Sequence, residues 1–380
     1  MKIGILTIAS PDGGGTYQYT LSLLEALKLY SKKDEYIQIR HPDFPKLLDK
    51  DIVINKKNSI LLKLKHLSHV YAGFFLGNPV PDIPAELLGI DLIISPTISL
   101  LPFHLQKPYI VTIHDFQQEY YPEFFTVRER ISRKIVYKTG KFAKTVVVES
   151  NFVKKDVITF LGTNKSKIKI LPSPPPSYLS TIKPEESKFR KTKEQYKLHD
   201  KYLFYPAQFW YHKNHINLLQ ALSYIRKNSE IISLVLVGSK KNNFENVMGK
   251  IEEFGIEGEV KYLGYVPDED MPYLYKLATA LVMPTLFESV SLPIWEAFCL
   301  GVPVVSSNVC ALPEQVGDAG LLFDPNNPED MAEKIYRVWT DENLRRELIN
   351  RGYERVKDLT LENYAKQWEE VIEEAREKVK

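Results

Sequence analysis

The stretch TALVMPTLFESVSLPIWEAFCLGVPVVSSN, residues 279–308, contains the structural pattern that decides the fold. It begins with an apolar run at 279–285 that is too short for a helix, and the loop 286–291 follows. Residues 292–300 predict a helix with Pro293 near its start, where a missing N–H costs nothing, and 302–307 predict a second strand. Such a strand–loop–helix–strand unit indicates a mainly parallel sheet covered by helices on both faces.

The same alternation extends along the chain in both directions. A proline-rich and then highly charged stretch at 172–200 interrupts it and is the best candidate for a linker. We therefore expect an N-terminal α/β domain at 1–178, a linker at 179–199 and a C-terminal α/β domain at 200–358. The tail 359–380 has apolar residues at helical spacing, which predicts an amphipathic helix that covers another surface. The other predicted strands are 2–8, 35–40, 91–95, 109–114, 145–150, 202–208, 233–239 and 259–266.

Composition and charge are those of a globular protein with two domains. The chain has 380 residues and a net charge of +2, which gives no support to nucleic acid as the main partner. Two cysteines, Cys299 and Cys310, are too few for a disulfide framework or a metal site and favour a reducing compartment. The N-terminus resembles a first strand rather than a secretion signal, and no stretch approaches the roughly 20 apolar residues of a membrane span. We therefore expect a cytoplasmic protein.

Three consecutive glycines, Gly13, Gly14 and Gly15, follow the first predicted strand and precede a helix. Glycine lets the backbone approach a ligand closely, and a helix N-terminus favours anions. A dinucleotide-binding loop would need a glycine near Gln18 and an acidic residue in place of Arg40, so a dehydrogenase does not fit. The loop is therefore either an anion site or a plain tight turn.

Two further strand ends carry polar residues suited to a ligand site. His114 and Asp115 stand at the end of the strand at 109–114, and Lys213 lies between the strand at 202–208 and a helix. A lysine beside a helix N-terminus is well placed to hold a phosphate. The alternatives are a satisfied core histidine and a solvated lysine.

Two carboxylates, Glu288 and Glu296, flank the start of the helix at 292–300. The backbone amides of Ser289, Val290, Ser291 and Leu292 would face an anion, with Ser291 as the N-cap and the positive helix end behind them. Carboxylates beside an anion would repel it unless they bind something else, and sugar hydroxyls are the natural partner. We expect Glu288 to accept from a transferred sugar and Glu296 from both ribose hydroxyls; two solvated helix-end acids are the alternative.

With these motifs in this order, the sequence resembles the retaining nucleotide-sugar glycosyltransferases of the GT-B fold, glycosyltransferase family 4 (group 1), and its mannosyltransferase-like members in particular. The similarity covers nearly the whole chain. The motifs that carry it are the glycine loop, TIHD, HKNHINLLQAL, LVLVGS, YLGYVPDEDMPYLY and FESVSLPIWEAFCLGVPVVSSNVCALPEQVGDAGLLFDP.

The resemblance implies two Rossmann-like, doubly wound domains that face a cleft, with the donor held mostly by the C-terminal one and the final helix crossing back to the N-terminal one. It implies that His114 lies near the transferred sugar, that Lys213 binds the diphosphate, and that the backbone near Val266 meets the nucleobase. Glu288 and Glu296 keep the roles given above, and the loop Gly13–Gly15 approaches the donor phosphates.

Two positions depart from the family pattern. Gln208 stands where an arginine is common, which removes one positive charge from the diphosphate site. The loop Ser289–Val290–Ser291 replaces a usual Gly-Phe-Gly, which narrows the space around the phosphates unless the serine hydroxyls act as donors.

The function implied is transfer of a hexose with retention, from GDP-mannose as the first candidate or a UDP-sugar as the second, to a hydroxyl of a glycan or lipid-linked acceptor. No Asp-x-Asp metal motif follows a strand, so we expect no metal and no cofactor. The basic amphipathic segment 55–75 predicts a peripheral contact with the inner membrane face, or else an ordinary solvated edge. The alternatives are a non-catalytic sugar-nucleotide-binding subunit and a sugar-nucleotide epimerase of the same architecture.

Overall fold

The computed structural model describes residues 1–9, 14–54, 87, 89–105, 107–181, 185–227 and 230–377. Gly13 and the segment 55–75 lie outside the described residues. The chain forms two compact units, of which unit 1 comprises Met1–Ser173 with Leu361–Lys380 and unit 2 comprises Pro174–Thr360. No helix in the described ranges is both long and apolar enough to cross a membrane.

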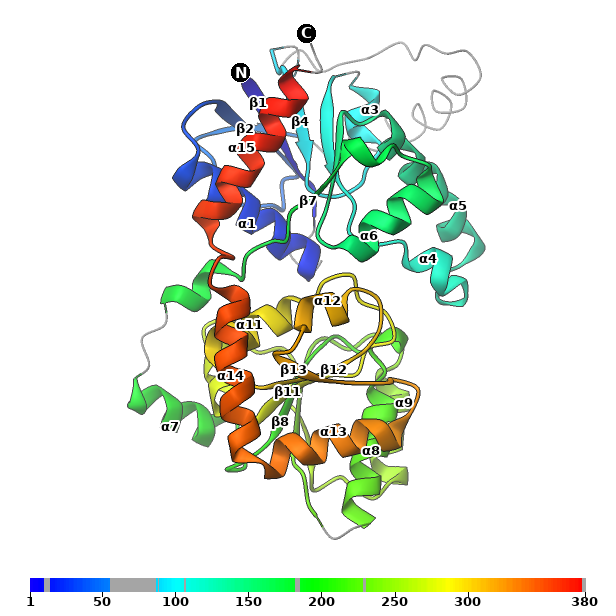
Figure 1. The fold of residues 1–380 in the computed structure, drawn as a ribbon, viewed down its shortest axis with the longest axis vertical. Coiled ribbons are helices and arrows are strands. Elements are labelled where there is room, and N and C mark those ends of the chain that lie inside the picture. The colour runs from blue at the N-terminus through cyan, green and yellow to red at the C-terminus, as the bar shows by residue number, and fades with distance from the viewer. Residues whose placement is uncertain are drawn as a thin grey trace. The chain divides into compact units, whose positions relative to one another are not determined.

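Unit 1 is built on a parallel sheet of seven strands in the order β3-β2-β1-β4-β5-β6-β7. Alternate residues of each strand face opposite sides, so Ile3 and Ile5 join one apolar cluster while Leu6 joins the other. Helices α1 and α15 cover the first cluster (Figure 1). The strands are β1 (Lys2–Thr7), β2 (Glu35–Arg40), β3 (Lys50–Val53), β4 (Leu92–Ser95), β5 (Tyr109–Thr112), β6 (Thr145–Val148) and β7 (Ile168–Ile170). The helices are α1 (Gly15–Tyr30), α3 (Leu101–His104), α4 (Gln117–Tyr120), α5 (Val127–Lys138), α6 (Asn151–Asp156) and α15 (Leu361–Glu377).

Unit 2 contains a parallel sheet of six strands in the order β10-β9-β8-β11-β12-β13. Both sheets follow the doubly wound order, in which the chain starts in the middle, moves to one edge and then returns to build the other. The structure therefore confirms two Rossmann-like α/β domains. The strands are β8 (Leu203–Pro206), β9 (Leu234–Val237), β10 (Val260–Tyr262), β11 (Ala280–Met283), β12 (Val304–Ser307) and β13 (Gly320–Phe323). The helices are α7 (Glu186–Gln195), α8 (His215–Lys227), α9 (Phe244–Glu253), α10 (Met271–Leu277), α11 (Leu292–Leu300), α12 (Leu312–Val316), α13 (Pro328–Thr340) and α14 (Glu342–Val356).

The segment predicted as a linker is partly helical. Residues 186–195 form α7, which packs on α10 through Phe189 and Tyr273, with ring centroids 5.1 Å apart. The Tyr196 hydroxyl, just after α7, donates to Asp270 at 2.6 Å. The boundary between the units falls at Ser173–Pro174, a few residues before the predicted one, and α7 belongs to unit 2.

The C-terminal helix α15 packs on α1 within unit 1 (Figure 1). Its buried residues recur at helical spacing and include Tyr364, Trp368 and Val371, and Trp368 is fully buried. Polar contacts at the rim add to this packing, since Ser31 donates to Glu369 at 2.6 Å and Arg376 pairs with Asp34 at 2.7 Å. The amphipathic tail of the sequence thus covers the first helix of the chain.

Candidate functional site

The chain reversal in unit 2 lies between β8 and β11, the place where doubly wound sheets bind ligands. Lys213 ends a short 3₁₀ turn, Tyr211–Lys213, just before α8, and Glu288 lies in the loop between β11 and α11. The Lys213 ammonium pairs with the Glu288 carboxylate, and each side chain is 18% exposed. The structure therefore brings these two predicted residues together at the expected edge of the sheet.

Neighbouring loops hold the backbone of Lys213 in place. Asn214 adopts a left-handed conformation, with φ of 56°, and its side-chain amide donates to the carbonyls of Pro284 and Pro325, both at 2.9 Å. The Tyr205 hydroxyl donates to the Lys213 carbonyl at 2.7 Å. These bonds join the loops after β8, β11 and β13, so three loops at the carboxyl edge of the sheet hold the backbone from which the Lys213 side chain extends.

Glu296 lies one turn inside α11 and is almost completely buried, with 8% exposed. One carboxylate oxygen accepts from the Tyr178 hydroxyl at 3.0 Å and the other from the Tyr275 hydroxyl at 2.5 Å. Burial raises the pKa of the Glu296 carboxyl, although both tyrosine hydrogen bonds oppose the increase. Each oxygen thus already has one donor, and only a second lone pair remains on each for the ribose contact that we predicted.

Gln315, in α12, fixes the start of α11. Its side-chain carbonyl accepts from the Ser291 amide at 2.9 Å, and its side-chain NH₂ donates to the Ser291 carbonyl at 2.7 Å. Ser291 occupies the N-cap position as expected, but its hydroxyl forms no capping bond and has no partner among the described residues. Of the four amides predicted to face an anion, that of Ser291 is therefore already engaged, whereas Ser289, Val290 and Leu292 are all partly exposed.

Gln208 and Val266 lie on the loops after β8 and β10. The side-chain carbonyl of Gln208 accepts from the Trp210 indole N–H at 2.9 Å, and the Val266 side chain is buried. Gly238, directly after β9, allows that loop to approach the loop after β8 closely, because a Cβ there would stand 2.3 Å from the Ala207 carbonyl oxygen. The Gly238 amide then donates to the Gly264 carbonyl at 3.0 Å, which joins the loops after β9 and β10.

In unit 1, His114 follows β5 and lines a cavity of about 290 Å³ with Thr16, Thr97, Asp115 and Arg133 among its other residues. Nδ1 of its ring lies 3.0 Å from Glu149 Oε2, and Nε2 lies 2.9 Å from the Pro96 carbonyl oxygen. Glu149 Oε1 accepts from the Ser173 hydroxyl at 2.6 Å.

Burial alone would lower the pKa of His114, but its bonds to Glu149 and Pro96 outweigh burial and raise it.

Gly14 precedes α1 with φ of 59°, in the left-handed region that favours glycine.

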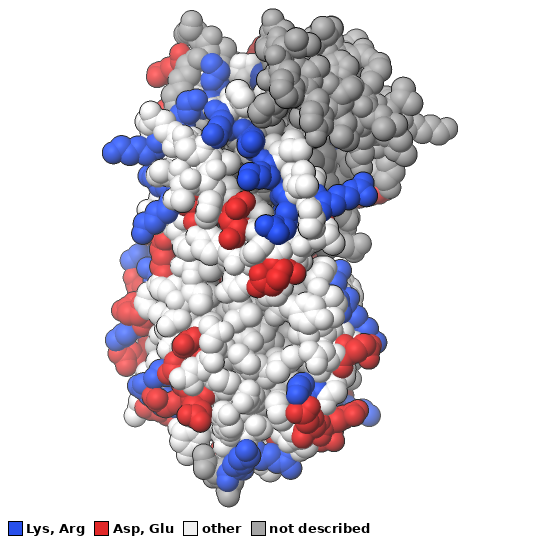
Figure 2. Space-filling model, turned by 90° about the vertical axis from the view of Figure 1, so that its right-hand side faces the viewer, with Lys and Arg blue, Asp and Glu red and all other residues white. Residues whose placement is uncertain are grey.

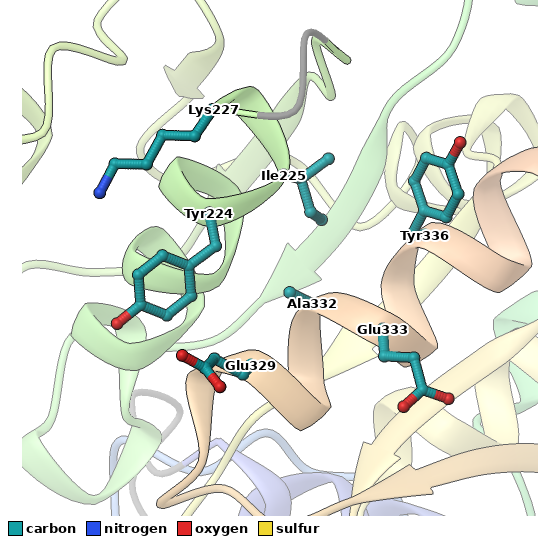
Figure 3. Close-up of a pocket in the computed structure, with 7 residues that line it drawn as sticks. All are labelled: Tyr224, Ile225, Lys227, Glu329, Ala332, Glu333 and Tyr336. Carbon is teal, nitrogen blue, oxygen red and sulfur yellow. The ribbon is translucent and has the colours of Figure 1, made fainter.

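Another hollow in unit 2 contains none of the predicted residues. It measures about 630 Å³ and lies between α8 and α13, where Tyr224 and Lys227 stand opposite Glu329, Glu333 and Tyr336 (Figure 3). Its lining comes from the sides of two helices rather than from the carboxyl ends of strands, so it is distinct from the site around Lys213 and Glu288.

Several residues of the site were not predicted from the sequence. Glu149 directly follows β6, and its position at a strand end was an available signal. Tyr178, Tyr275 and Gln315 gave no such signal, because they lie in a 3₁₀ turn and in two helices.

Comparison with known proteins shows the family of the chain. Residues 186–355 match the family model described as glycosyl transferases group 1. The chain is 32% identical over 278 residues to O-antigen chain mannosyltransferase B of Escherichia coli, an alignment that covers 69% of each protein. The chain belongs to the group 1 glycosyltransferases. The resemblance inferred from the motifs is thereby confirmed.

A further relative and a solved structure extend the comparison. This glycosyltransferase is 23% identical over 335 residues to O-antigen chain mannosyltransferase RfbU of Salmonella typhimurium, covering 86% of the chain and 88% of that protein. The structure of Anabaena HepE in complex with UDP and glucose superposes with a TM-score of 0.74 at 19% identity, covering 98% of the chain and 99% of HepE. At that identity the superposition shows the fold alone, so the roles assigned to individual site residues stay predictions.

Proposed function

We propose that this glycosyltransferase moves a hexose, with retention of anomeric configuration, from a nucleoside-diphosphate sugar to a hydroxyl of a glycan or lipid-linked acceptor. GDP-mannose is the first donor and a UDP-sugar the second. Support comes from the names of two relatives, both O-antigen chain mannosyltransferases, and from the UDP and glucose bound to HepE. The observation that carries the proposal is the pairing of Lys213 with Glu288 at the β8–β11 reversal.

The proposed roles follow from the charge and position of each group. Lys213 binds the diphosphate, while Glu288, released from Lys213, accepts hydroxyls of the transferred sugar. Glu296 uses its remaining lone pairs for the ribose, and the backbone near Val266 meets the nucleobase. Gln208 and the loop Ser289–Leu292 border the phosphates, as does the glycine loop that includes Gly14 and Gly15.

The proposed mechanism is substitution on the front face of the sugar. The acceptor hydroxyl forms the new bond to the anomeric carbon on the side from which the nucleoside diphosphate leaves, and its proton passes to a donor phosphate oxygen. Lys213 and the N-terminus of α11 stabilise the charge that grows on the diphosphate. We propose that this requires no metal, so activity should survive an excess of chelator; loss that added Mg²⁺ or Mn²⁺ restores would contradict it.

A thermal-shift panel of GDP, UDP and their mannose, glucose and N-acetylglucosamine conjugates tests the donor. We expect a guanosine conjugate to raise the melting temperature most, and then to support transfer to a synthetic lipid-linked glycan. A shift with uridine conjugates alone would replace GDP-mannose by the second donor. A shift without transfer to any acceptor would indicate the non-catalytic binding subunit, and conversion of donor to an epimer would indicate the epimerase.

We further propose a peripheral contact between unit 1 and an anionic membrane. Helix α5 carries five Lys or Arg and one Glu, and it exposes Val127 (69%) and Ile131 (56%) on one face, one turn apart. Lys and Arg side chains gather in a band on the side of unit 1 that carries α5 (Figure 2). A basic helix with exposed apolar side chains is suited to the surface of an anionic bilayer.

Flotation with vesicles of phosphatidylglycerol and phosphatidylcholine tests this contact. We expect the protein to float with anionic vesicles at low salt, and the variant Lys134→Glu/Lys138→Glu to remain at the bottom. The variant Lys357→Glu/Lys366→Glu, with the same change in charge just after α14 and in α15, is the control. Equal flotation of both variants, or none of the wild type, would refute a role for α5.

A further inference from the structure

Both ring nitrogens of His114 face hydrogen-bond acceptors. Nε2 lies 2.9 Å from the Pro96 carbonyl oxygen, which has no hydrogen to offer, so Nε2 must carry one. Nδ1 lies 3.0 Å from Glu149 Oε2. The protonation state of the ring therefore depends on which side of the Nδ1–Oε2 bond the proton occupies.

Two features place that proton on the histidine. An imidazole is more basic than a carboxylate, with ordinary pKa values of about 6.5 and about 4.3. The Ser173 hydroxyl donates to the other oxygen of Glu149 at 2.6 Å, which stabilises the charged form of the carboxylate. With a hydrogen on each nitrogen, His114 is an imidazolium whose two N–H groups are both engaged.

We infer that Glu149 is a positioning residue that holds His114 as a doubly protonated imidazolium, so that His114 acts on its substrate through positive charge rather than through a free ring nitrogen. The inference rests on the proposed function for the identity of the substrate. The His114 side chain is 18% exposed and lines the 290 Å³ cavity of unit 1. The group that it would stabilise there is a substrate oxygen that gains negative charge, such as an acceptor hydroxyl losing its proton.

The other groups around His114 are compatible with a cation. Asp115 adds a second negative charge and lies 4.0 Å from Arg133, which partly neutralises it. The Tyr19 ring, from α1, contacts the imidazole edge-on, with ring centroids 4.8 Å apart. Burial raises the pKa of Tyr19 and of the nearby Tyr364 in α15, so both hydroxyls are neutral. The bonds to Glu149 and Pro96 raise the pKa of His114 against the effect of burial.

Nitrogen NMR of protein labelled with ¹⁵N-histidine tests the inference without any substrate. The His114 signals are assigned by their loss in His114→Gln. We expect both ring nitrogens of the wild type to have imidazolium shifts at pH 7.5. In Glu149→Gln the pKa of His114 should fall by about 1–3 units, the usual effect of losing a charged partner. A His114 ring that is neutral in the wild type at pH 7.5, or unaffected by Glu149→Gln, would overturn the inference.

Three further variants separate charge from structure. Glu149→Asp keeps the charge and should restore the imidazolium signals at least in part, whereas Ser173→Ala should lower the pKa of His114 less than Glu149→Gln does. Asp156→Asn removes another buried carboxylate of unit 1, one that bonds to Tyr120 and not to His114, and should leave the His114 signals unchanged. If Asp156→Asn shifted them as far as Glu149→Gln, the effect would not belong to Glu149.

Turnover provides the second readout and separates this inference from the proposed function. With a donor identified from the thermal-shift panel, kcat of Glu149→Gln should fall as pH rises above the lowered pKa, while KM for the donor stays near the wild-type value. An imidazolium in the wild type together with a pH-independent kcat in Glu149→Gln would refute the catalytic part alone. Absence of transfer with intact imidazolium signals would instead count against the proposed function.

Discussion

Replacing Lys213 with methionine removes the ammonium group that pairs with Glu288 and keeps an unbranched side chain of similar length. If Lys213 binds the diphosphate, the variant loses one hydrogen bond between charged groups, worth about 1.5–3 kcal/mol. Both side chains are 18% exposed, so solvent screens the contact and the lower half of that range applies. A loss of about 1.5–2 kcal/mol corresponds to a Kd for nucleoside diphosphate that is roughly 10- to 30-fold higher.

Isothermal titration at about 0.1 M salt measures this change with GDP and with UDP. Lys227→Met, in the hollow between α8 and α13, makes the same substitution in unit 2 outside the predicted site and is the matched control. The double variant Lys213→Met/Glu288→Gln should recover part of the affinity, because it also removes a carboxylate that would otherwise repel the diphosphate. A Kd for Lys213→Met within threefold of wild type, or an equal loss in Lys227→Met, would refute the phosphate role.

Four further predictions follow from the contacts described above. Tyr178→Phe and Tyr275→Phe each remove one donor from buried Glu296, so the free energy of unfolding in urea should fall by about 1–3 kcal/mol, and no loss would contradict the network. Trp368→Ala should destabilise unit 1 by about 3–5 kcal/mol, measured by hydrogen exchange of α1 amides, with α11 amides unaffected. Because the pKa of His114 is raised in the folded protein, protonated His114 stabilises the folded state. This contribution is complete below about pH 6.5 and is lost as pH rises through the folded pKa. The melting temperature of wild type should accordingly exceed that of Glu149→Gln more at pH 6 than at pH 9. Ser291→Ala should not lower the melting temperature, since its hydroxyl forms no bond to lose, and a large drop would show that the hydroxyl caps α11.

Most of the fold could be predicted because its determinants are local in sequence. Buried strands of a parallel sheet are continuous apolar runs, and TVVV at β6 and LVLV at β9 are completely buried. The tail could also be predicted as an amphipathic helix, since its apolar residues recur at helical spacing and form the buried face of α15. Helix α7 was missed because its sequence, ESKFRKTKEQ, is almost wholly polar and buries little more than Thr192.

In the site, too, some contacts could be predicted from the sequence and others could not. Lys213 and Glu288 could be predicted to meet, because each follows a central strand and the carboxyl ends of parallel strands share one edge. The same rule was available for His114 and Glu149, which follow the neighbouring strands β5 and β6. The tyrosine partners of Glu296 could not be predicted, since Tyr178, for example, reaches it from a position 118 residues away in the chain. Side-chain pairs of this kind depend on rotamers and on the spacing of packed elements, which composition and periodicity do not encode.

The loop Ser289–Val290–Ser291 shows how one local departure is accommodated. The sequence predicts crowding where glycines are usual, yet the structure fixes Ser291 through two hydrogen bonds to Gln315 that use only its backbone. The hydroxyl is left buried and without a partner among the described residues, at the start of a helix whose partial positive charge attracts anions. A buried hydroxyl without a hydrogen bond costs about 1–3 kcal/mol, and an acceptor bound there would offset that cost. We therefore expect the serine, in place of the usual glycine, to add a donor to the predicted phosphate site, so Ser291→Ala should weaken binding of nucleoside diphosphate without lowering stability.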